Sequence, residues 1–391
     1  MLDWFACLLA PRLPSLLEFA AGPLPEPAAA PELAARASAA HDAALALPFH
    51  PRGQTDPYKL LMGMGCRDLV TREADQHPDT AGRTPNYDGL PFEPVEIPLG
   101  EGRPVLTGQR STGAPGAPVV LVVHGLFDSH VSGYVVELAE SLRRMGFHVL
   151  ALDLRDHGRL RGRPPPLSLG LEEGRDLFLA ARTLARAEGC SVGLLGLSYG
   201  AHCAVRAAYE ASAAGEPEVL RGGVMAICGP LDVREALLAF DDSARLPRPR
   251  GLQQRAVFAG LLSTMGRHLS LRLGEAGQRG RRGELYQRYV RDVVMPRLPG
   301  TPEQMHDFLG LARSARAGIT DQIRVPTLLL HPLDDPLVPV QHLRAALAAA
   351  DGNPWVAGRE LPAGGHVGLP AVDPEGTLAL LGTWFGLLRD G

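Results

Sequence analysis

The hydrophobic pattern becomes regular after residue 90, where short apolar runs alternate with amphipathic segments. The runs at 118–125, 148–154 and 191–198 are apolar at successive positions, which is typical of strands buried on both faces. The segments 134–146 and 172–189 have helical spacing instead, and each ends on a glycine suited to a helix C-cap. This alternation predicts an α/β fold with a mostly parallel central sheet and helices on both of its faces.

The same pattern divides the chain into parts. Residues 91–230 and 324–391 carry the α/β pattern, and they open with a predicted hairpin formed by the strand-like runs around "GEG". The interval 231–323 lacks strand patterning and is too long for a loop, so we expect an inserted helical cap. Residues 1–90 are rich in proline and alanine at first and then in turn formers, which predicts an N-terminal extension.

One strand leads into a serine flanked by glycines, in the sequence "VGLLGLSYGAH" at 192–202. A serine hydroxyl is a poor nucleophile unless a base removes its proton and donors stabilise the oxyanion. A tight strand-to-helix turn of the form G-x-S-x-G presents such a hydroxyl above a sheet, and places the next backbone N–H at a helix N-terminus. Ser198 is therefore the candidate nucleophile, and the amide of Tyr199 a candidate oxyanion donor.

A second oxyanion donor is expected in the loop after the strand at 118–125. This strand ends in His124 and Gly125, and Leu126 supplies the candidate amide. His124 could act as a base, although support of the loop through hydrogen bonds is the favoured interpretation.

The acid and the base should follow the serine in that order, at the ends of later strands. "LLLHPLDDPLVP" ends a strand with Asp334 and Asp335, and "ELPAGGHVGLP" places His366 in a turn after the last strand. We expect Asp335 and His366 to complete a triad with Ser198. Asp334 and Asp232 remain alternatives for the acid, and His331 is expected to be a supporting residue.

Composition narrows the function classes. The chain of 391 residues has a formal net charge of −4, and Lys59 is its only lysine. Nucleic-acid binding requires concentrated basic charge, so it is disfavoured. The five cysteines show no C-x-x-C spacing, which disfavours a disulfide framework or a zinc site. The apolar start carries Asp3 and is interrupted by Pro11 and Pro14, so we expect neither a secretory signal nor a stable membrane span, and a cytoplasmic location.

Two other groups of polar residues are candidate binding sites. "DLRDHGR" contains Asp153, Asp156 and His157, which could bind a metal, but a polar turn after a strand is the favoured interpretation. The arginines of 277–291 could meet an anion, although solvated helix faces are favoured for them. The sequence thus predicts no metal and no organic cofactor.

These motifs together resemble the α/β-hydrolase superfamily over about residues 95–390. Within it, "VVLVVHGLFDSH", "LDLRDHG", "DDPLVP" and "GGHVGL" are most similar to the bacterial YheT-like hydrolases, a branch of predicted esterases. The resemblance implies a triad of Ser198, His366 and Asp335, oxyanion donors Leu126 and Tyr199, and a cap over the substrate pocket.

The expected function is hydrolysis of a small-molecule carboxylic ester through an acyl-enzyme. An acyltransferase that uses the same triad and a non-catalytic binding protein of the same fold are the alternatives. Some apolar residues of the cap suggest either a pocket for an apolar acyl group or the core of the cap itself: Phe258, Leu262, Met265, Tyr286 and Tyr289.

Overall fold

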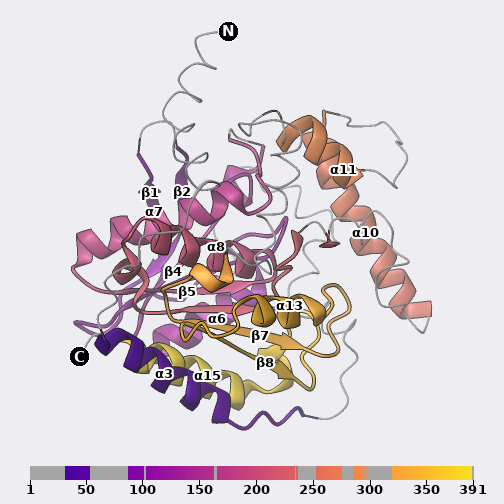
Figure 1. Ribbon diagram of the computed structural model, residues 1–391. Helices are drawn as coiled ribbons and strands as arrows, with labels where there is room; N and C mark the ends of the chain where they lie inside the picture. Colours follow the sequence, from indigo (N-terminus) through magenta and orange to yellow (C-terminus); the bar gives the residue numbers. More distant parts are fainter. Residues whose placement is uncertain are drawn as a thin grey trace.

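The computed structural model is built around one eight-stranded sheet (Figure 1). It describes residues 31–52, 87–100, 103–162, 165–233, 235–236, 252–274, 285–294, 296 and 319–389. The strands, in the spatial order β1-β2-β4-β3-β5-β6-β7-β8, have these bounds: β1 Glu93–Pro98, β2 Val105–Ser111, β3 Val119–Val123, β4 His148–Leu152, β5 Val192–Leu197, β6 Val224–Ile227, β7 Thr327–Pro332 and β8 Val356–Leu361.

The sheet is parallel from β4 to β8, and the predicted hairpin forms its antiparallel edge. In that hairpin β1 pairs with β2, and β2 then pairs antiparallel with β4. The five pairings from β4 through β3 to β8 are all parallel. The predicted open, mostly parallel α/β sheet is confirmed.

Helices cover both faces of the sheet, because the central strands are apolar at every position. In β3, Val119, Leu121 and Val123 pack into one core cluster, while Val120 and Val122 pack into the other. The helices of the first face are α7 (Leu171–Glu188), α8 (Tyr199–Ala213) and α13 (Gln341–Ala349). Those of the second are α3 (Pro31–Ala46), α6 (Gly133–Arg144) and α15 (Pro374–Leu388). Short α14 (Leu369–Val372) leads into α15.

Part of the predicted N-terminal extension packs on the core. Helix α3 lies along α15 (Figure 1) and buries Ala37, Ala40 and Ala44. The ring of His41 contacts the backbone oxygen of Thr327 in β7 at 3.1 Å. Small side chains allow this close helix packing, so this alanine-rich part of the predicted extension forms a packed helix.

The described parts of the interval 231–323 are mainly helical. They include α10 (Leu252–Arg272), α11 (Leu285–Tyr289) and a π-helical turn at Val290–Val294. Helix α10 buries Leu261, Met265 and Leu269 in the first-face core. Most arginines of 277–291 and the side chain of Tyr286 lie outside the described residues. None of the helices in the described ranges is long and apolar enough to cross a membrane.

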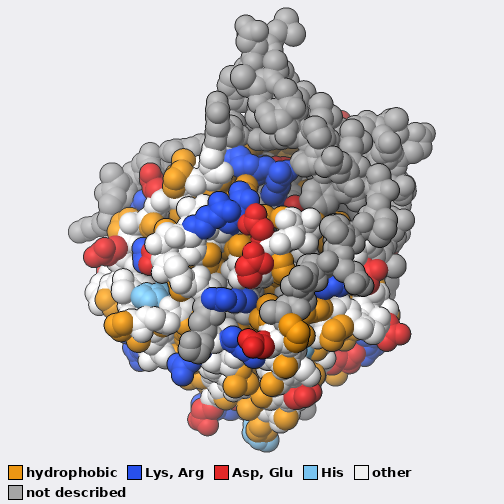
Figure 2. Space-filling model, turned by 60° about the vertical axis from the view of Figure 1, so that its left-hand side comes forward, with side chains coloured by type: hydrophobic (Ala, Val, Ile, Leu, Met, Phe, Trp, Pro, Cys, Tyr) orange, Lys and Arg blue, Asp and Glu red, His pale blue; other side chains and the backbone are white. Residues whose placement is uncertain are grey.

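Charged side chains are mixed on the face shown in Figure 2, where arginines (blue) lie beside acidic residues (red). Among the described residues, partly exposed arginines pair with acidic side chains, including Arg110 with Glu188 at 2.9 Å and Arg182 with Glu216 at 3.5 Å. Exposed pairs of this kind contribute little to stability, and a mixed surface fits the small net charge.

Candidate active site

Ser198 occupies a strained turn between β5 and α8. Its backbone has φ 54° and ψ −120°, a conformation that side-chain-bearing residues rarely adopt. The turn carries the hydroxyl to the C-terminal edge of the sheet, where the parallel strands of an α/β fold gather their functional loops.

The glycines on both sides of Ser198 are required by close backbone packing. A Cβ at Gly196 would lie 2.3 Å from the backbone oxygen of Gly200. A Cβ at Gly200 would lie 2.5 Å from the backbone oxygens of both Val123 and His124. The G-x-S-x-G spacing thus lets α8 start directly against β3.

Replacing Gly200 by alanine is expected to lower the free energy of unfolding by about 2–4 kcal/mol, because the overlap is with backbone that cannot move aside. Urea unfolding monitored by circular dichroism measures this loss. The matched control is Gly386→Ala in α15, where an added Cβ meets nothing within 4 Å. That change should be neutral or stabilising by up to about 1 kcal/mol, and equal effects of the two substitutions would contradict the packing argument.

His366 bridges the serine and an aspartate. Its Nε2 lies 2.8 Å from Ser198 Oγ, and its Nδ1 lies 2.8 Å from Asp335 Oδ2. Both His366 and Asp335 are 5% exposed, so the chain of hydrogen bonds is largely screened from water. The structure therefore brings together the three side chains that the sequence singled out, although they are separated by 137 and 31 positions.

Asp335 is fixed from its other side by the backbone. Its Oδ1 accepts hydrogen bonds from the amides of Leu337 and Val338, at 2.8 and 3.0 Å. Burial alone would raise the pKa of Asp335, but the contact with His366 outweighs burial and lowers that pKa. The carboxylate is thus held ionised, with Oδ2 directed at the imidazole.

The rival acids have other partners. Asp334 Oδ1 accepts a hydrogen bond from the amide of Gly365 at 2.8 Å, which tethers the loop that carries His366. Asp232 accepts from the amide of Glu235 at 3.0 Å. His331 lies at 2.8 Å from the backbone oxygen of Val338 and so supports the turn around Asp335.

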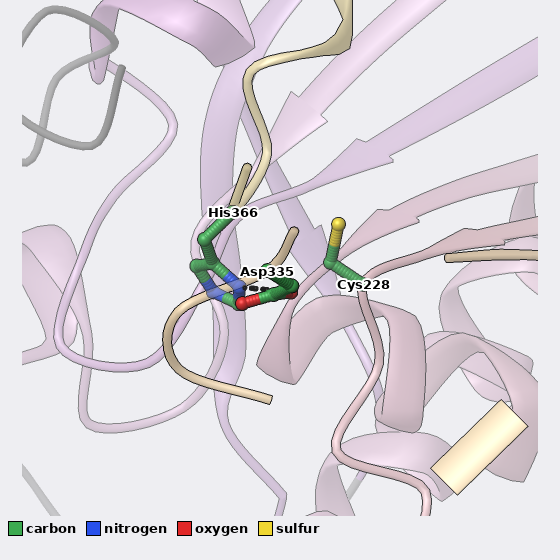
Figure 3. A group of neighbouring side chains, drawn as sticks. All are labelled: Cys228, Asp335 and His366. Atoms are coloured by element: carbon green, nitrogen blue, oxygen red, sulfur yellow. Dashed lines mark hydrogen bonds and ion pairs between the residues drawn. The ribbon is translucent and has the colours of Figure 1, made fainter. Parts of the chain in front are cut away.

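Cys228, which the sequence did not connect with the site, lies beside the acid and the base at the end of β6 (Figure 3). Ligand-type atoms of Cys228, Asp335 and His366 lie within 4.8 Å of one another. A metal ion would need a lone pair of His366, but Nδ1 and Nε2 are both engaged, with Asp335 and Ser198. Burial raises the pKa of the Cys228 thiol well above its usual range, so a thiolate ligand is disfavoured too. The group fits an acid–base pair better than a metal centre.

His124 fixes the peptide that carries the candidate donor Leu126. Its Nε2 accepts from the amide of Leu154 at 3.1 Å, so the ring proton is on Nδ1, which donates to Gly125 O at 2.7 Å. In a trans peptide the N–H points opposite to the C=O. The Leu126 N–H is therefore directed away from His124, and Leu126 lines the cavity beside Ser198.

Tyr134, a second residue that the sequence did not indicate, holds the same loop. Its hydroxyl accepts a hydrogen bond from the amide of Gly125 at 2.8 Å. A Cβ at Gly125 would lie 3.3 Å from this hydroxyl and 3.6 Å from Ser198 Oγ, so the loop packs directly on the serine. A tyrosine at the start of a helix carries no sequence signal for such a contact.

The residues of "DLRDHGR" serve the loops around the site. Asp153 accepts from the amides of His130 and Arg159, at 2.9 and 3.1 Å. Asp156 binds the amide of Gly162 and the side chain of Arg272. Within the described ranges, these side chains do not converge as a set of metal ligands.

Buried histidines make the stability of the protein depend on pH. Burial lowers the pKa of His124 and His342 to about 4 and that of His202 and His268 to about 3. In the unfolded chain these rings take up protons near pH 6.5, so below that pH the unfolded state holds more protons than the folded state. The free energy of unfolding is therefore expected to fall from pH 7 to pH 4.5, by up to about 1.4 kcal/mol per histidine and pH unit. Urea unfolding at several pH values tests this, and a free energy of unfolding that stays constant or rises on acidification would contradict it.

The family follows from comparison with known proteins. Residues 118–370 match the family model of the alpha/beta hydrolase fold, and the chain belongs to that family. None of the comparisons supports the narrower assignment to the YheT-like branch.

Solved structures share the fold at low sequence identity. An esterase of Pyrococcus furiosus, Pf2001, is similar with a TM-score of 0.50 and 19% identity, covering 87% of this chain and 98% of its own. A thioesterase domain from the curacin biosynthetic pathway has a TM-score of 0.40 and 18% identity, covering 74% of this chain and 98% of its own. Among the curated proteins, none matches the sequence. At 19% identity, the similarity to the Pf2001 esterase concerns the fold alone.

Proposed function

We propose that this protein is a serine hydrolase that cleaves carboxylic esters through an acyl-enzyme. The observation that carries the proposal is the continuous hydrogen-bond chain from Ser198 through His366 to Asp335, with 2.8 Å at each step. It lies on the wall of a cavity to which both Ser198 and His366 contribute. Membership of the α/β-hydrolase family supports the same assignment.

In the proposed reaction, His366 Nε2 takes the proton of Ser198 Oγ as the oxygen attacks the ester carbonyl. The carbonyl oxygen becomes an oxyanion, which the amides of Leu126 and Tyr199 stabilise. The Tyr199 amide belongs to the first turn of α8, where a negative charge is favoured.

His366 then gives its proton to the leaving alcohol. A water molecule, deprotonated by the same imidazole, attacks the acyl-enzyme and restores Ser198. Asp335 keeps the proton of the neutral imidazole on Nδ1 and stabilises the imidazolium that forms in each half-reaction. The proposed steps need only groups of this chain and water.

Hydrolysis of p-nitrophenyl acetate and butyrate by the purified full chain tests the proposal. An acyl-enzyme predicts steady release of nitrophenol, with an initial burst of up to one equivalent where deacylation is slower than acylation. Inactivation by a fluorophosphonate should be stoichiometric. Folded protein that neither hydrolyses these esters nor reacts with the fluorophosphonate would refute the assignment.

A further inference from the structure

The cavity in front of Ser198 is small and almost entirely apolar. Its volume is about 70 Å³. Leu261 and Met265 of α10 line it together with residues from the loops that follow the strands. The main apolar side chains on its wall are Leu126, Leu169, Val233, Leu261, Met265 and Val338.

Positive charge is missing from the described wall of this cavity, although the chain is rich in arginine. Among the described lining residues, the acidic and basic side chains are Asp128 and His366. An acyl group that ends in a carboxylate would meet no cation there and would face Asp128. Burial of such a charge without a partner costs several kcal/mol, so a neutral acyl group is favoured.

We propose that the enzyme selects esters of short, uncharged, apolar acyl groups, an inference that rests on the proposed function. Leu261 and Met265 of α10 set the length of the acyl chain that the pocket accepts. A cavity needs about 10–15 Å³ for each water molecule that it holds, and a carbon atom of an acyl chain needs a similar space. The volume of about 70 Å³ therefore accommodates an acyl chain of about five atoms. Both side chains are buried, at 2% and 6% exposure, and they line the cavity together with Ser198 while also belonging to the core.

A series of p-nitrophenyl esters from acetate to decanoate tests this proposal. The wild-type protein should show the highest kcat/KM at about four to six acyl carbons and a fall of at least about 10-fold at ten. Met265→Ala removes about three non-hydrogen atoms from the wall of the pocket and should raise kcat/KM for the longer esters about 10-fold relative to butyrate. Leu252→Ala is the matched control, since Leu252 lies on the same helix with 87% of its side chain exposed.

The outcomes separate this proposal from the proposed function. Fluorophosphonate labelling of Ser198 together with a wild-type optimum at decanoate would refute the short-acyl pocket and leave the hydrolase assignment intact. An unchanged chain-length profile in Met265→Ala that still unfolds cooperatively would also refute it, and Leu261→Ala repeats the test if Met265→Ala does not fold. Absence of both labelling and hydrolysis would instead refute the proposed function.

A separate set of contacts joins α10 to the loop that carries Leu126. Arg272 donates from Nε to Asp156 Oδ2 and from a terminal nitrogen to Asp156 O, each at 2.5 Å. Its guanidinium also lies over the ring of Phe127, 4.9 Å from the ring centre. Phe127 directly follows Leu126, is 1% exposed and has a φ of 61°, which is strained for a bulky residue.

We infer that Arg272 is a positioning residue that holds Phe127 and thereby orients the Leu126 amide toward the oxyanion. The ring of Phe127 is also stacked against His268 of α10, at 5.1 Å between centres, so the loop is held from α10 at two points. The inference rests on the proposed function, because it assigns Arg272 an effect on oxyanion stabilisation. A displaced Leu126 amide lowers kcat more than it weakens substrate binding, because the oxyanion forms only during the reaction. A general loss of stability changes neither kcat nor KM of the molecules that remain folded.

Arg272→Met and Arg272→Lys, with Arg255→Met on the exposed surface of α10 as control, test this inference. Arg272→Met should lower kcat for p-nitrophenyl acetate about 10- to 100-fold, with a smaller change in KM. Arg272→Lys should retain only part of the wild-type kcat, because lysine lacks the planar guanidinium group that binds Asp156. Unchanged kcat in a folded Arg272→Met would overturn the inference. If that variant does not fold, Asp156→Asn is tested in its place, because it weakens the same contact with Arg272. A lowered kcat in Asp156→Asn supports the inference, and an unchanged kcat overturns it. Complete labelling of Ser198 in the wild-type protein shows independently that the proposed function holds.

Discussion

Replacing Ser198 by alanine is expected to abolish ester hydrolysis, with a fall in kcat of about 10⁶-fold. The substitution removes the only atom that would form the acyl-enzyme bond. It also leaves His366 Nε2 without the hydroxyl that it now contacts at 2.8 Å. Initial rates with p-nitrophenyl butyrate, measured at high enzyme concentration, give the size of the loss.

The fold should tolerate this change, because alanine fills most of the volume of serine. The matched control is Ser212→Ala, which removes the hydroxyl of another buried serine, one that donates to the backbone oxygen of Ala208 near the C-terminal end of α8. That variant should keep most of the activity. Hydrolysis by Ser198→Ala within about 10-fold of the wild-type rate would exclude Ser198 as the nucleophile.

Asp335→Asn is expected to lower kcat by about 10⁴-fold, which is the order that a wrong imidazole tautomer costs in Ser-His-Asp enzymes. The backbone amides of Leu337 and Val338 donate to Oδ1 of Asp335. In the asparagine variant these amides retain the side-chain oxygen, so the NH₂ group must face His366 Nδ1. His366 then accepts at Nδ1 and carries its proton on Nε2, where it cannot take the proton of Ser198.

Asp334→Asn is the control for Asp335→Asn, since the two residues are adjacent and each is bound to backbone amides. The asparagine oxygen can still accept from the amide of Gly365, so the loop around His366 should stay in place. A loss of less than about 10-fold is expected for it. Equal losses in the two variants would show that Asp335 acts by supporting the loop rather than by setting the tautomer.

The sequence predicted the sheet well because its strands are buried on both faces. A strand such as β3 must be apolar at every position, and a continuous apolar run of this kind can be recognised in the sequence alone. The antiparallel edge could also be predicted, because "GEG" separates two strand-like runs in the sequence. Helix α3 was harder to predict, because an alanine-rich segment indicates a packed helix only when its partner, α15, is known.

The candidate triad could be proposed from sequence because the ends of parallel strands meet at one edge. Ser198, Asp335 and His366 each follow such a strand, and topology alone brings them together. Tyr134 and Arg272 could not be found in this way. Both act through side chains that reach across from helices, and the contacts with Gly125 and Phe127 depend on how those helices pack.

The most direct test of the account is mass-spectrometric mapping of the fluorophosphonate adduct. If the hydrogen-bond chain activates one hydroxyl, the folded protein should carry one adduct, on the peptide that contains Ser198. The adduct should be lost in His366→Ala and in protein unfolded before labelling. A folded, ester-hydrolysing protein that carries its adduct on another residue, or that stays unlabelled, would contradict the claim that Ser198 is the activated nucleophile.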